Sequence, residues 1–238
     1  MIGTLLNLVG IVAGGIIGLF WRKGLSPQKE SMFRVLLGVF TVFYGLRLTW
    51  ISLNGPGAQI LKQLGIAVLS LMLGKLAGQL LRLQKASNRL GQGARERIAN
   101  QSVNPPPGEG FKICAALFCA APLGILGAIQ DGLSGYYYPL LVKAVMEGLA
   151  AMGFVQLFGW GVMLSAIPVL AVQGTIALGC KEFLEPRLQA HGLVDSINAV
   201  GGLLVFSVAL VILELKKIEL ADYLPSLVFA PVLTWLWR

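Results

Sequence analysis

The sequence predicts an all-α membrane protein that crosses the bilayer about eight times. Of its 238 residues, 56% are hydrophobic and only 13% are charged, whereas about a quarter of the residues in a soluble domain carry a charge. The apolar residues form long runs, and each run is close to the ~20 residues that one bilayer crossing needs. The mean hydropathy of +0.76 agrees with this composition. We therefore expect a polytopic membrane protein.

Eight apolar runs have a suitable length for a transmembrane helix. We predict spans over residues 2–21, 35–53, 60–81, 111–129, 140–158, 162–180, 197–213 and 221–237. The first run has no basic segment before it and is interrupted by Asn7, so we expect a retained span and not a cleaved signal peptide.

Glycine pairs mark the first and third spans. Gly14 and Gly18 lie one helical turn apart in the first span, and Gly74 and Gly78 repeat this spacing in the third. Small residues at this spacing let two helix backbones approach closely. The glycine-rich faces are therefore expected to pack against other helices, and they could also join two copies of the chain into a homo-oligomer.

A basic linker separates the third and fourth spans. Residues 82–110 are polar and contain three consecutive prolines near their end, and their basic residues are Arg82, Lys85, Arg89, Arg95 and Arg97. We expect an exposed, partly flexible linker, whose first part could form an amphipathic helix on the membrane surface. It divides the chain into a three-helix N-terminal membrane unit, residues 1–81, and a C-terminal membrane unit, residues 111–238.

The fourth to sixth spans carry the strongest local signals. Pro122 predicts a kink in the fourth span because proline has no backbone N–H for the helix. Three tyrosines at 136–138 follow that span and suit a membrane interface. A Gly-Trp-Gly turn at 159–161 then separates two apolar runs. We therefore predict two spans over residues 140–180, with a partly re-entrant hairpin as the alternative.

Charge distribution predicts that both termini lie outside. The loops 22–34, 82–112, 159–161 and 214–219 would share one side, and they hold more than twice as many Lys and Arg residues as the opposite side. Positive loops stay in the cytoplasm, so the linker 82–110 should be cytoplasmic. Residues 37–43 resemble residues 202–208, which would make spans one to three and six to eight inverted repeats, as in many secondary transporters.

Seven polar residues inside or beside the spans are the candidate substrate-binding residues. An ionisable group in lipid costs roughly 2.5–3.5 kcal/mol on insertion scales, so each one needs a reason to be there. The depth of each residue follows from its distance to the outer end of its span, at a helix rise of 1.5 Å per residue. By this measure, most of the seven lie in the outer third of the membrane. They are Asn7, Gln130, Asp131, Lys143, Glu147, Gln173 and Asn198.

Two interpretations of these residues stay open. Lys143 and Glu147 are four residues apart and can pair on one helix face, and the amides could then simply hold helices together. Alternatively, the carboxylates Asp131 and Glu147 and the neighbouring amides could line an outward-facing cavity, because oxygen donors suit small cations and polar solutes. We expect a transporter of a small solute or ion, and the alternative is a structural or assembly protein without transport activity.

The sequence predicts no enzyme, cofactor, metal site or nucleic-acid partner. Cys114, Cys119 and Cys180 lie in apolar segments without metal-like spacing, and His191 stands alone in a polar loop. No nucleophile–base pair or phosphate-binding loop accompanies them. The net charge of +8 is explained by the cytoplasmic loops, so the lipid bilayer is the expected partner.

Several motifs resemble those of one bacterial family. The motifs are residues 1–4 with Asn7, Ile129-Gln130-Asp131-Gly132, residues 143–148, residues 165–169 with Gln173-Gly174, Gly201-Gly202, and Leu224-Pro225-Ser226. The chain is similar over nearly its whole length to the inner-membrane family of domain of unknown function 554. This resemblance implies a multi-span protein of the bacterial plasma (inner) membrane, often described as a transporter candidate, without an established substrate. Glu147 departs from the family pattern, where Asp is usual, and its extra methylene moves the carboxylate.

Overall fold

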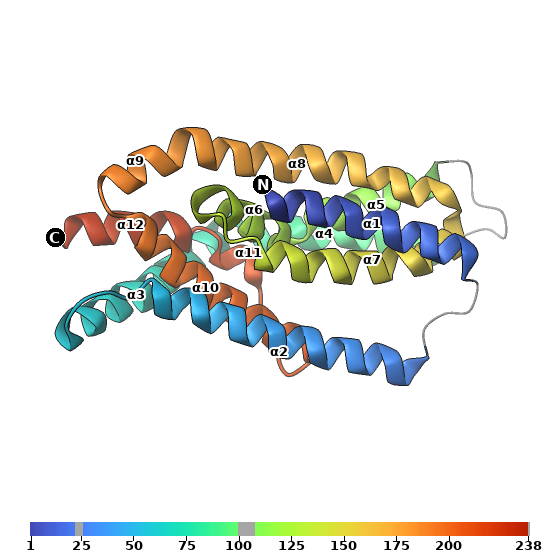
Figure 1. Cartoon of the computed structure of the whole chain (residues 1–238). Helices are drawn as coiled ribbons and strands as arrows, with labels where there is room; N and C mark the ends of the chain where they lie inside the picture. Colours follow the sequence, from blue (N-terminus) through green and yellow to red (C-terminus); the bar gives the residue numbers. More distant parts are fainter. Residues whose placement is uncertain (22–25, 100–107, 238) are drawn as a thin grey trace.

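The computed structural model describes residues 1–21, 26–99 and 108–237, and every regular element in these ranges is a helix (Figure 1). Six helical segments in the described ranges are long and apolar enough to cross a membrane. They are α1 (Ile2–Phe20), α2 (Pro27–Ile51), α3 (Gly57–Leu81), α7 (Tyr138–Phe158), the run Trp160–Ala190 and α10 (Val194–Ile212). The predicted all-α polytopic class is confirmed.

The other two predicted spans are broken helices. Residues 111–129 belong to α5 (Glu109–Ala120) and α6 (Pro122–Ser134), which meet at an angle of 60°. Residues 221–237 form the short α11 (Leu220–Tyr223) and α12 (Ser226–Leu236). The described residues therefore contain six helical segments long and apolar enough to span a membrane, or seven if the bent pair counts as one span. Pro122 at the start of α6 explains the first break, as predicted.

Residues 140–180 form two separate helical segments, each part of a stretch long and apolar enough to cross a membrane, in agreement with the two predicted runs. After α7 the backbone turns at Gly159, whose φ of 73° suits glycine. The second span begins with a 3₁₀ turn (Trp160–Ser165) and continues as α8 (Ala166–Gly179). A π-helical turn (Cys180–Leu184) then joins α8 to α9 (Glu185–Ala190), so this segment extends beyond the predicted end at residue 180.

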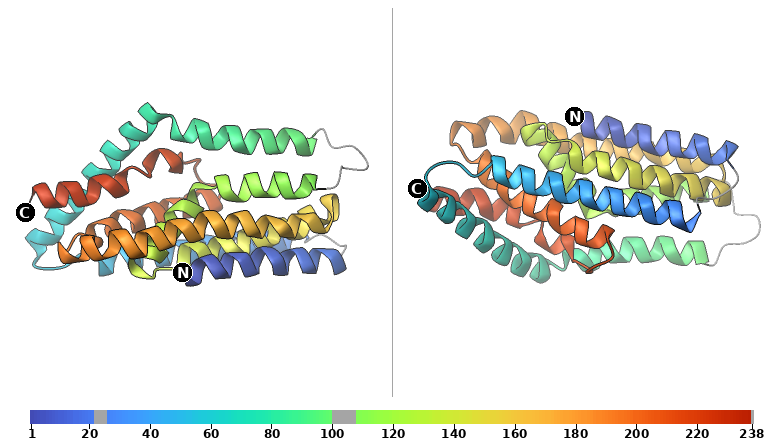
Figure 2. Two further views of the ribbon diagram at one scale, coloured as in Figure 1. Left: turned by 90° about the horizontal axis from the view of Figure 1, so that it is seen from above. Right: turned by 60° about the horizontal axis from the view of Figure 1, so that its bottom comes forward.

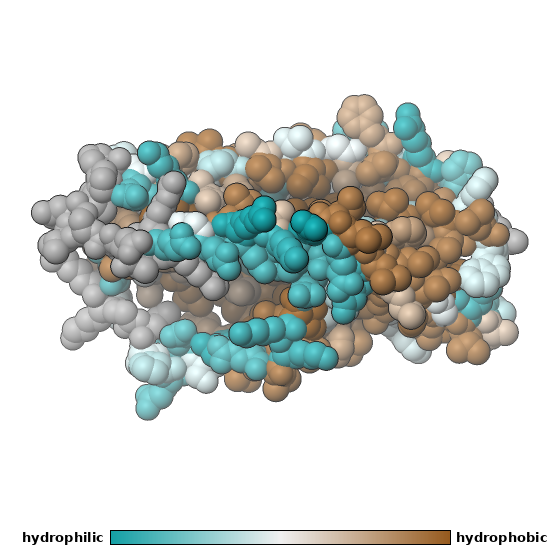
Figure 3. All heavy atoms as spheres, turned by 180° about the vertical axis from the view of Figure 1, so that it is seen from behind, coloured by the Kyte–Doolittle hydropathy of each residue, from teal (hydrophilic) through white to brown (hydrophobic). Residues whose placement is uncertain are grey.

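The first part of the basic linker is helical. Helix α4 (Leu83–Ala99) packs against α5 through a face that includes the buried Ala94, and the two helices run side by side (Figure 2). The exposed polar side chains of α4 contribute to a hydrophilic band on the back of the molecule, beside a broad apolar surface (Figure 3). The predicted Pro-rich end of the linker, residues 104–107, lies outside the described residues.

The first three helices pack mainly against helices of the C-terminal part of the chain. Helix α1 lies against α7, α2 against α10, and α3 against α12 and α11. In the first pair, a Cβ atom added to Gly14 would lie 2.0 Å from the Gly148 carbonyl oxygen, and one added to Gly18 would lie 2.4 Å from that of Met152. Only glycine allows such close backbone contact.

The glycine faces predicted to join two copies of the chain are used inside it. Besides the α1–α7 contact, a Cβ atom on Gly74 would lie 2.4 Å from the Ser226 backbone nitrogen, and one on Gly78 would lie 2.0 Å from the Asp222 carbonyl oxygen. These faces are covered by α7, α11 and α12, so they cannot bind a second copy in the folded protein. The sequence pattern indicated close packing correctly and could not identify the partner helix.

The two segments that suggested an inverted repeat lie in α2 and α10. These helices are antiparallel: Thr49 donates to the Ala199 carbonyl at 3.2 Å near one end, and Gly38 contacts Leu213 near the other. Gly45 and Gly202 let the two backbones cross closely between these points. An inverted repeat requires the two similar segments to cross the membrane in opposite directions, and the antiparallel packing of α2 and α10 agrees with this requirement. The internal repeat itself stays a prediction.

Membrane topology gives the first testable prediction. Loops predicted to be cytoplasmic meet at one end of the helix bundle, where Arg34 forms an ion pair of 2.5 Å with Glu214. The chain ends at the opposite end, where Lys62 at the start of α3 donates to the Trp237 carbonyl. A reporter fused after Leu90 should therefore be cytoplasmic, and one fused after the last residue should not. A cytoplasmic reporter at the C-terminus would contradict this orientation.

Candidate functional site

The break between α5 and α6 creates the first feature of the site. Pro122 has no N–H, so the carbonyl of Phe118, four residues earlier, has no intrahelical donor. The Lys143 ammonium of α7 donates to this carbonyl at 3.0 Å. A buried carbonyl without a partner would cost about 1–3 kcal/mol. Lys143 therefore compensates for the proline break.

Lys143 also forms a buried ion pair with Glu147, one turn later in α7. The two residues are only 2% and 6% exposed, and the predicted i,i+4 pairing is confirmed. Glu147 lies near the middle of α7, which runs from Tyr138 to Phe158, and Lys143 lies one turn closer to its start. Removing two charges from water costs several kcal/mol for each ion, which the attraction within the pair offsets only when the geometry is good.

Two amides from other helices complete this group. Asn7 of α1 donates to the Gln173 side-chain carbonyl of α8 at 3.2 Å, and both amides are buried. Asn7 also lies beside the Glu147 carboxylate. We call Asn7, Lys143, Glu147 and Gln173 the central polar cluster. Gly124 of α6 makes room for it, since a Cβ atom there would lie 2.8 Å from Lys143 Cε and 3.0 Å from Gln173 Nε2.

Three polar atoms of the central polar cluster have no hydrogen-bond partner among the described residues. They are Glu147 Oε2, Asn7 Oδ1 and Gln173 Nε2, and all three are buried. A buried polar atom without a partner is expensive and calls for an explanation. The cluster therefore retains hydrogen-bonding capacity that a water molecule, an ion or a solute could use.

A cavity of about 740 Å³ reaches the ion pair. Its wall includes Lys143 and Glu147, the helix break at Ala121–Leu123, and apolar side chains of α2, α7 and α10. It extends to Arg34 and Glu214, at the end of the bundle predicted to be cytoplasmic. With the predicted orientation this cavity would face the cytoplasm, whereas the sequence indicated an outward-facing one, and the orientation itself stays a prediction. Glu147 lies mid-helix in α7, and the cavity extends from it toward the end that holds Arg34 and Glu214.

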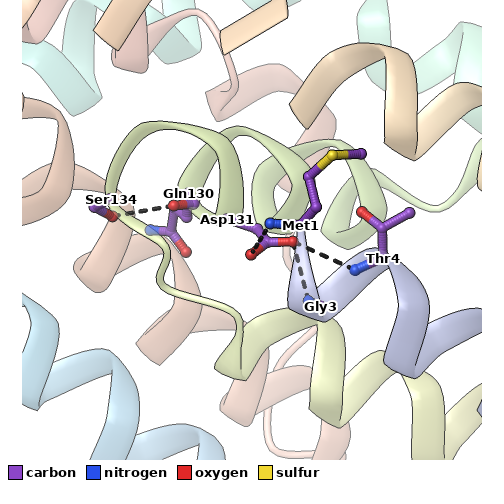
Figure 4. Close-up of polar contacts among 6 residues, drawn as sticks. All are labelled: Met1, Gly3, Thr4, Gln130, Asp131 and Ser134. Carbon is purple, nitrogen blue, oxygen red and sulfur yellow. Dashed lines mark hydrogen bonds and ion pairs between the residues drawn. The ribbon is translucent and has the colours of Figure 1, made fainter. Parts of the chain in front are cut away.

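Asp131 has a different environment from the central polar cluster. Its carboxylate accepts hydrogen bonds from the backbone N–H groups of Gly3 (3.0 Å) and Thr4 (3.3 Å), and it pairs with the Met1 amino group at 3.1 Å (Figure 4). Free N–H groups at a helix N-terminus favour an anionic partner. Asp131 thus anchors the start of α1 to α6.

The anchoring contact gives a second prediction. Replacing Asp131 by Asn removes the charge and keeps the shape, so we expect a loss of about 1–3 kcal/mol in unfolding free energy, the range for a hydrogen-bonded charged group. Thermal unfolding of the purified protein measures this change. Asp195→Asn, at an exposed position, is the matched control and should have little effect. Equal stability of the two variants would contradict the anchoring role.

Gln130 and Asn198 form a third group, between α6 and α10. Ser134 donates to the Gln130 backbone carbonyl at 3.0 Å (Figure 4) and lies 3.3 Å from Asn198 Oδ1. The Gln130 side chain is fully buried against Gly201, and neither of its polar atoms has a partner among the described residues. The structure thus separates the seven predicted residues into the central polar cluster, Asp131, and the Gln130–Asn198 group.

Sequence reasoning missed three contributors to these groups: the Phe118 carbonyl, Gly124 and Ser134. The first was detectable in principle, because a proline inside an apolar run leaves the carbonyl four residues earlier without a donor. The roles of Gly124 and Ser134 depend on which helices pack together. No local pattern in the sequence contains that information.

These features define a polytopic α-helical membrane protein with a buried ion pair at a broken helix. The chain belongs to the family described as protein of unknown function (DUF554), whose model matches residues 2–235. It is 31% identical to the uncharacterized membrane protein YdfK of Bacillus subtilis, over 98% of this chain and 95% of that protein. It is 27% identical to the uncharacterized protein YqgA of Escherichia coli, over 100% and 97%. No solved structure matches the fold.

Proposed function

We propose that this protein is a non-enzymatic transporter of a small solute or ion in the bacterial inner membrane, with the central polar cluster as its binding site. The observation that carries this proposal is the cavity of about 740 Å³ that reaches the buried Lys143–Glu147 pair. Ligand pockets commonly have volumes of about 300–1,000 Å³. Ionisable residues inside a membrane protein commonly mark a path for a solute or an ion.

The broken helix supports the same proposal. The cavity wall includes Ala121, Pro122 and Leu123, where α5 ends and α6 begins. Transporters often build their sites at discontinuous helices, because the free backbone groups and dipole ends of the two halves can contact a ligand. Here the Phe118 carbonyl is one such freed group, and Lys143 holds it in the resting arrangement.

The second candidate is a structural or assembly protein, favoured by a specific observation. Lys143 and Glu147 neutralise each other, and Lys143 satisfies the Phe118 carbonyl. A pair of this kind could serve only to fix the break between α5 and α6. This alternative leaves the cavity and the unpaired atoms of the central polar cluster without a role.

Ligand-dependent stability of the purified protein distinguishes the two candidates. A ligand that binds only the folded state stabilises it by mass action, by about 2.7 kcal/mol at a concentration of 100 times Kd. We expect at least one compound in a panel of inorganic cations, amines, organic acids and neutral polar solutes to raise the unfolding temperature. Glu147→Gln should abolish this effect, and proteoliposomes should then show flux of the same compound.

The control is an exposed carboxylate far from the cavity lining, Glu182 in the π-helical turn after α8. Glu182→Gln should leave the ligand effect unchanged. The proposal fails if no compound stabilises the protein, no flux is detected, and the charge-free double variant Lys143→Met with Glu147→Gln behaves like the native protein.

A further inference from the structure

The shape of the cavity restricts the class of substrate. Its volume of about 740 Å³ is far larger than an inorganic ion requires and falls in the range for drug-sized molecules. Most of its wall is apolar, with side chains such as Phe33, Leu37, Met146 and Met152. Methionine side chains are flexible and polarisable and adapt to apolar ligands of varied shape. A solute that fills this space therefore needs a sizeable apolar body.

The charges around the cavity favour a cation. Among the described residues that line it, the acidic ones are Glu30, Glu147 and Glu214, and the basic ones are Arg34 and Lys143. Arg34 lies between the two acids at the mouth, 3.3 Å from Glu30 and 2.5 Å from Glu214. Among the lining residues themselves, one carboxylate is therefore in excess, while the adjacent segments also carry Lys29, Lys216 and Lys217. A surplus of one sign in a low-dielectric cleft raises the local concentration of ions of the opposite sign.

The deep end of the cavity offers acceptors for such a cation. Lys143 occupies Glu147 Oε1, and Glu147 Oε2 has no partner among the described residues. Asn7 lies next to Glu147 through its side-chain amide, and its side-chain oxygen likewise has no partner among the described residues. An ammonium group that reached Glu147 could donate to these oxygens without displacing Lys143. Hydrogen bonds between ionised partners are about twice as strong as neutral ones.

We propose that the substrate is a lipophilic organic ammonium ion, whose apolar body fills the cavity while its cationic group contacts Glu147 and Asn7. This inference rests on the proposed transport function and adds the chemical class of the substrate. The excess carboxylate among the lining residues would favour a cation over an anion, and the apolar wall would select against small hydrated ions.

Two fluorescent probes of opposite charge test the inference on the full-length protein in lipid nanodiscs. Rhodamine 6G is a lipophilic organic cation whose charge is shared with two N–H-bearing ethylamino groups, and fluorescein is an aromatic anion. Fluorescence anisotropy should show saturable binding of rhodamine 6G above the level in empty nanodiscs, with fluorescein bound at least about tenfold more weakly. Glu147→Gln should weaken rhodamine 6G binding by about tenfold or more, the equivalent of one charge-assisted contact. Glu182→Gln should leave it unchanged.

The charge-free double variant Lys143→Met with Glu147→Gln covers the case in which Glu147→Gln alone does not fold. It keeps the cavity and lacks the anionic acceptor, so it should also lose rhodamine 6G binding. Equal or tighter binding of fluorescein would overturn the inference, as would rhodamine 6G binding that neither variant reduces. If another compound from the panel shows Glu147-dependent stabilisation or flux while rhodamine 6G does not bind, the transport function stands and the proposed substrate class fails.

Discussion

Replacing Lys143 by Met is expected to destabilise the protein by about 3–5 kcal/mol, the usual effect of removing one partner of a buried ion pair. The variant would leave the Glu147 carboxylate buried and uncompensated, and it would also remove the donor to the Phe118 carbonyl. Glu147→Gln should destabilise less, because the Gln side-chain oxygen can still accept a hydrogen bond from Lys143.

The double variant Lys143→Met with Glu147→Gln should recover much of this loss. A neutral pair removes the uncompensated charge, and apolar replacements of buried ion pairs are often neutral or stabilising. Thermal unfolding in detergent is the measurement. Applied to the native protein, both single variants and the double variant, it completes the thermodynamic cycle. Lys181→Met, at an exposed position, is the matched control. Strictly additive effects would contradict a direct interaction between the two side chains.

Replacing Gly14 by Ala is also expected to destabilise the protein strongly. The new Cβ atom would lie 2.0 Å from the Gly148 carbonyl oxygen and 2.7 Å from its Cα atom, so α1 and α7 would have to move apart. Forcing extra atoms into a well-packed interface typically costs about 1–3 kcal/mol. The same movement would shift Asn7 away from Glu147, and the central polar cluster would loosen.

Gly65→Ala is the matched control for this prediction. Gly65 is also a helical glycine, in α3, but a Cβ atom there meets no other atom within 4 Å. Alanine is the better helix former by roughly 1 kcal/mol, so this variant should be as stable as the native protein or slightly more stable. Thermal unfolding of both variants compares the two sites. If the two variants were equally stable, the contact between α1 and α7 would be looser than it is in the structure.

Part of the candidate site was predictable because it depends on local geometry. Lys143 and Glu147 share a helix face at a four-residue spacing, and the structure confirms their pairing. The cost of amides and carboxylates in lipid also pointed to the seven polar residues, all of which are buried in the structure, and their role in binding stays a prediction. The sequence could not divide that set, and only the folded chain joins Asn7 to Gln173 across 166 residues.

The sequence by itself determined the all-α membrane class, the approximate number of apolar helices, the position of the proline break and the i,i+4 ion pair. All of these follow from composition, from the length of apolar runs and from the period of a helix, which act over a few turns of chain. The helix-forming tendency of the linker's first part was visible in the same way.

Only the tertiary structure decided which helices share the glycine faces, where Asp131 finds its partners and toward which end the cavity opens. The Gly14–Gly148 contact and the Asp131–Gly3 contact join residues more than 100 positions apart. Apolar helix faces of similar composition are nearly interchangeable in lipid, which provides no hydrophobic driving force between helices. The choice among them depends on the detailed fit of backbones and side chains, and that fit exists only once the whole chain is folded.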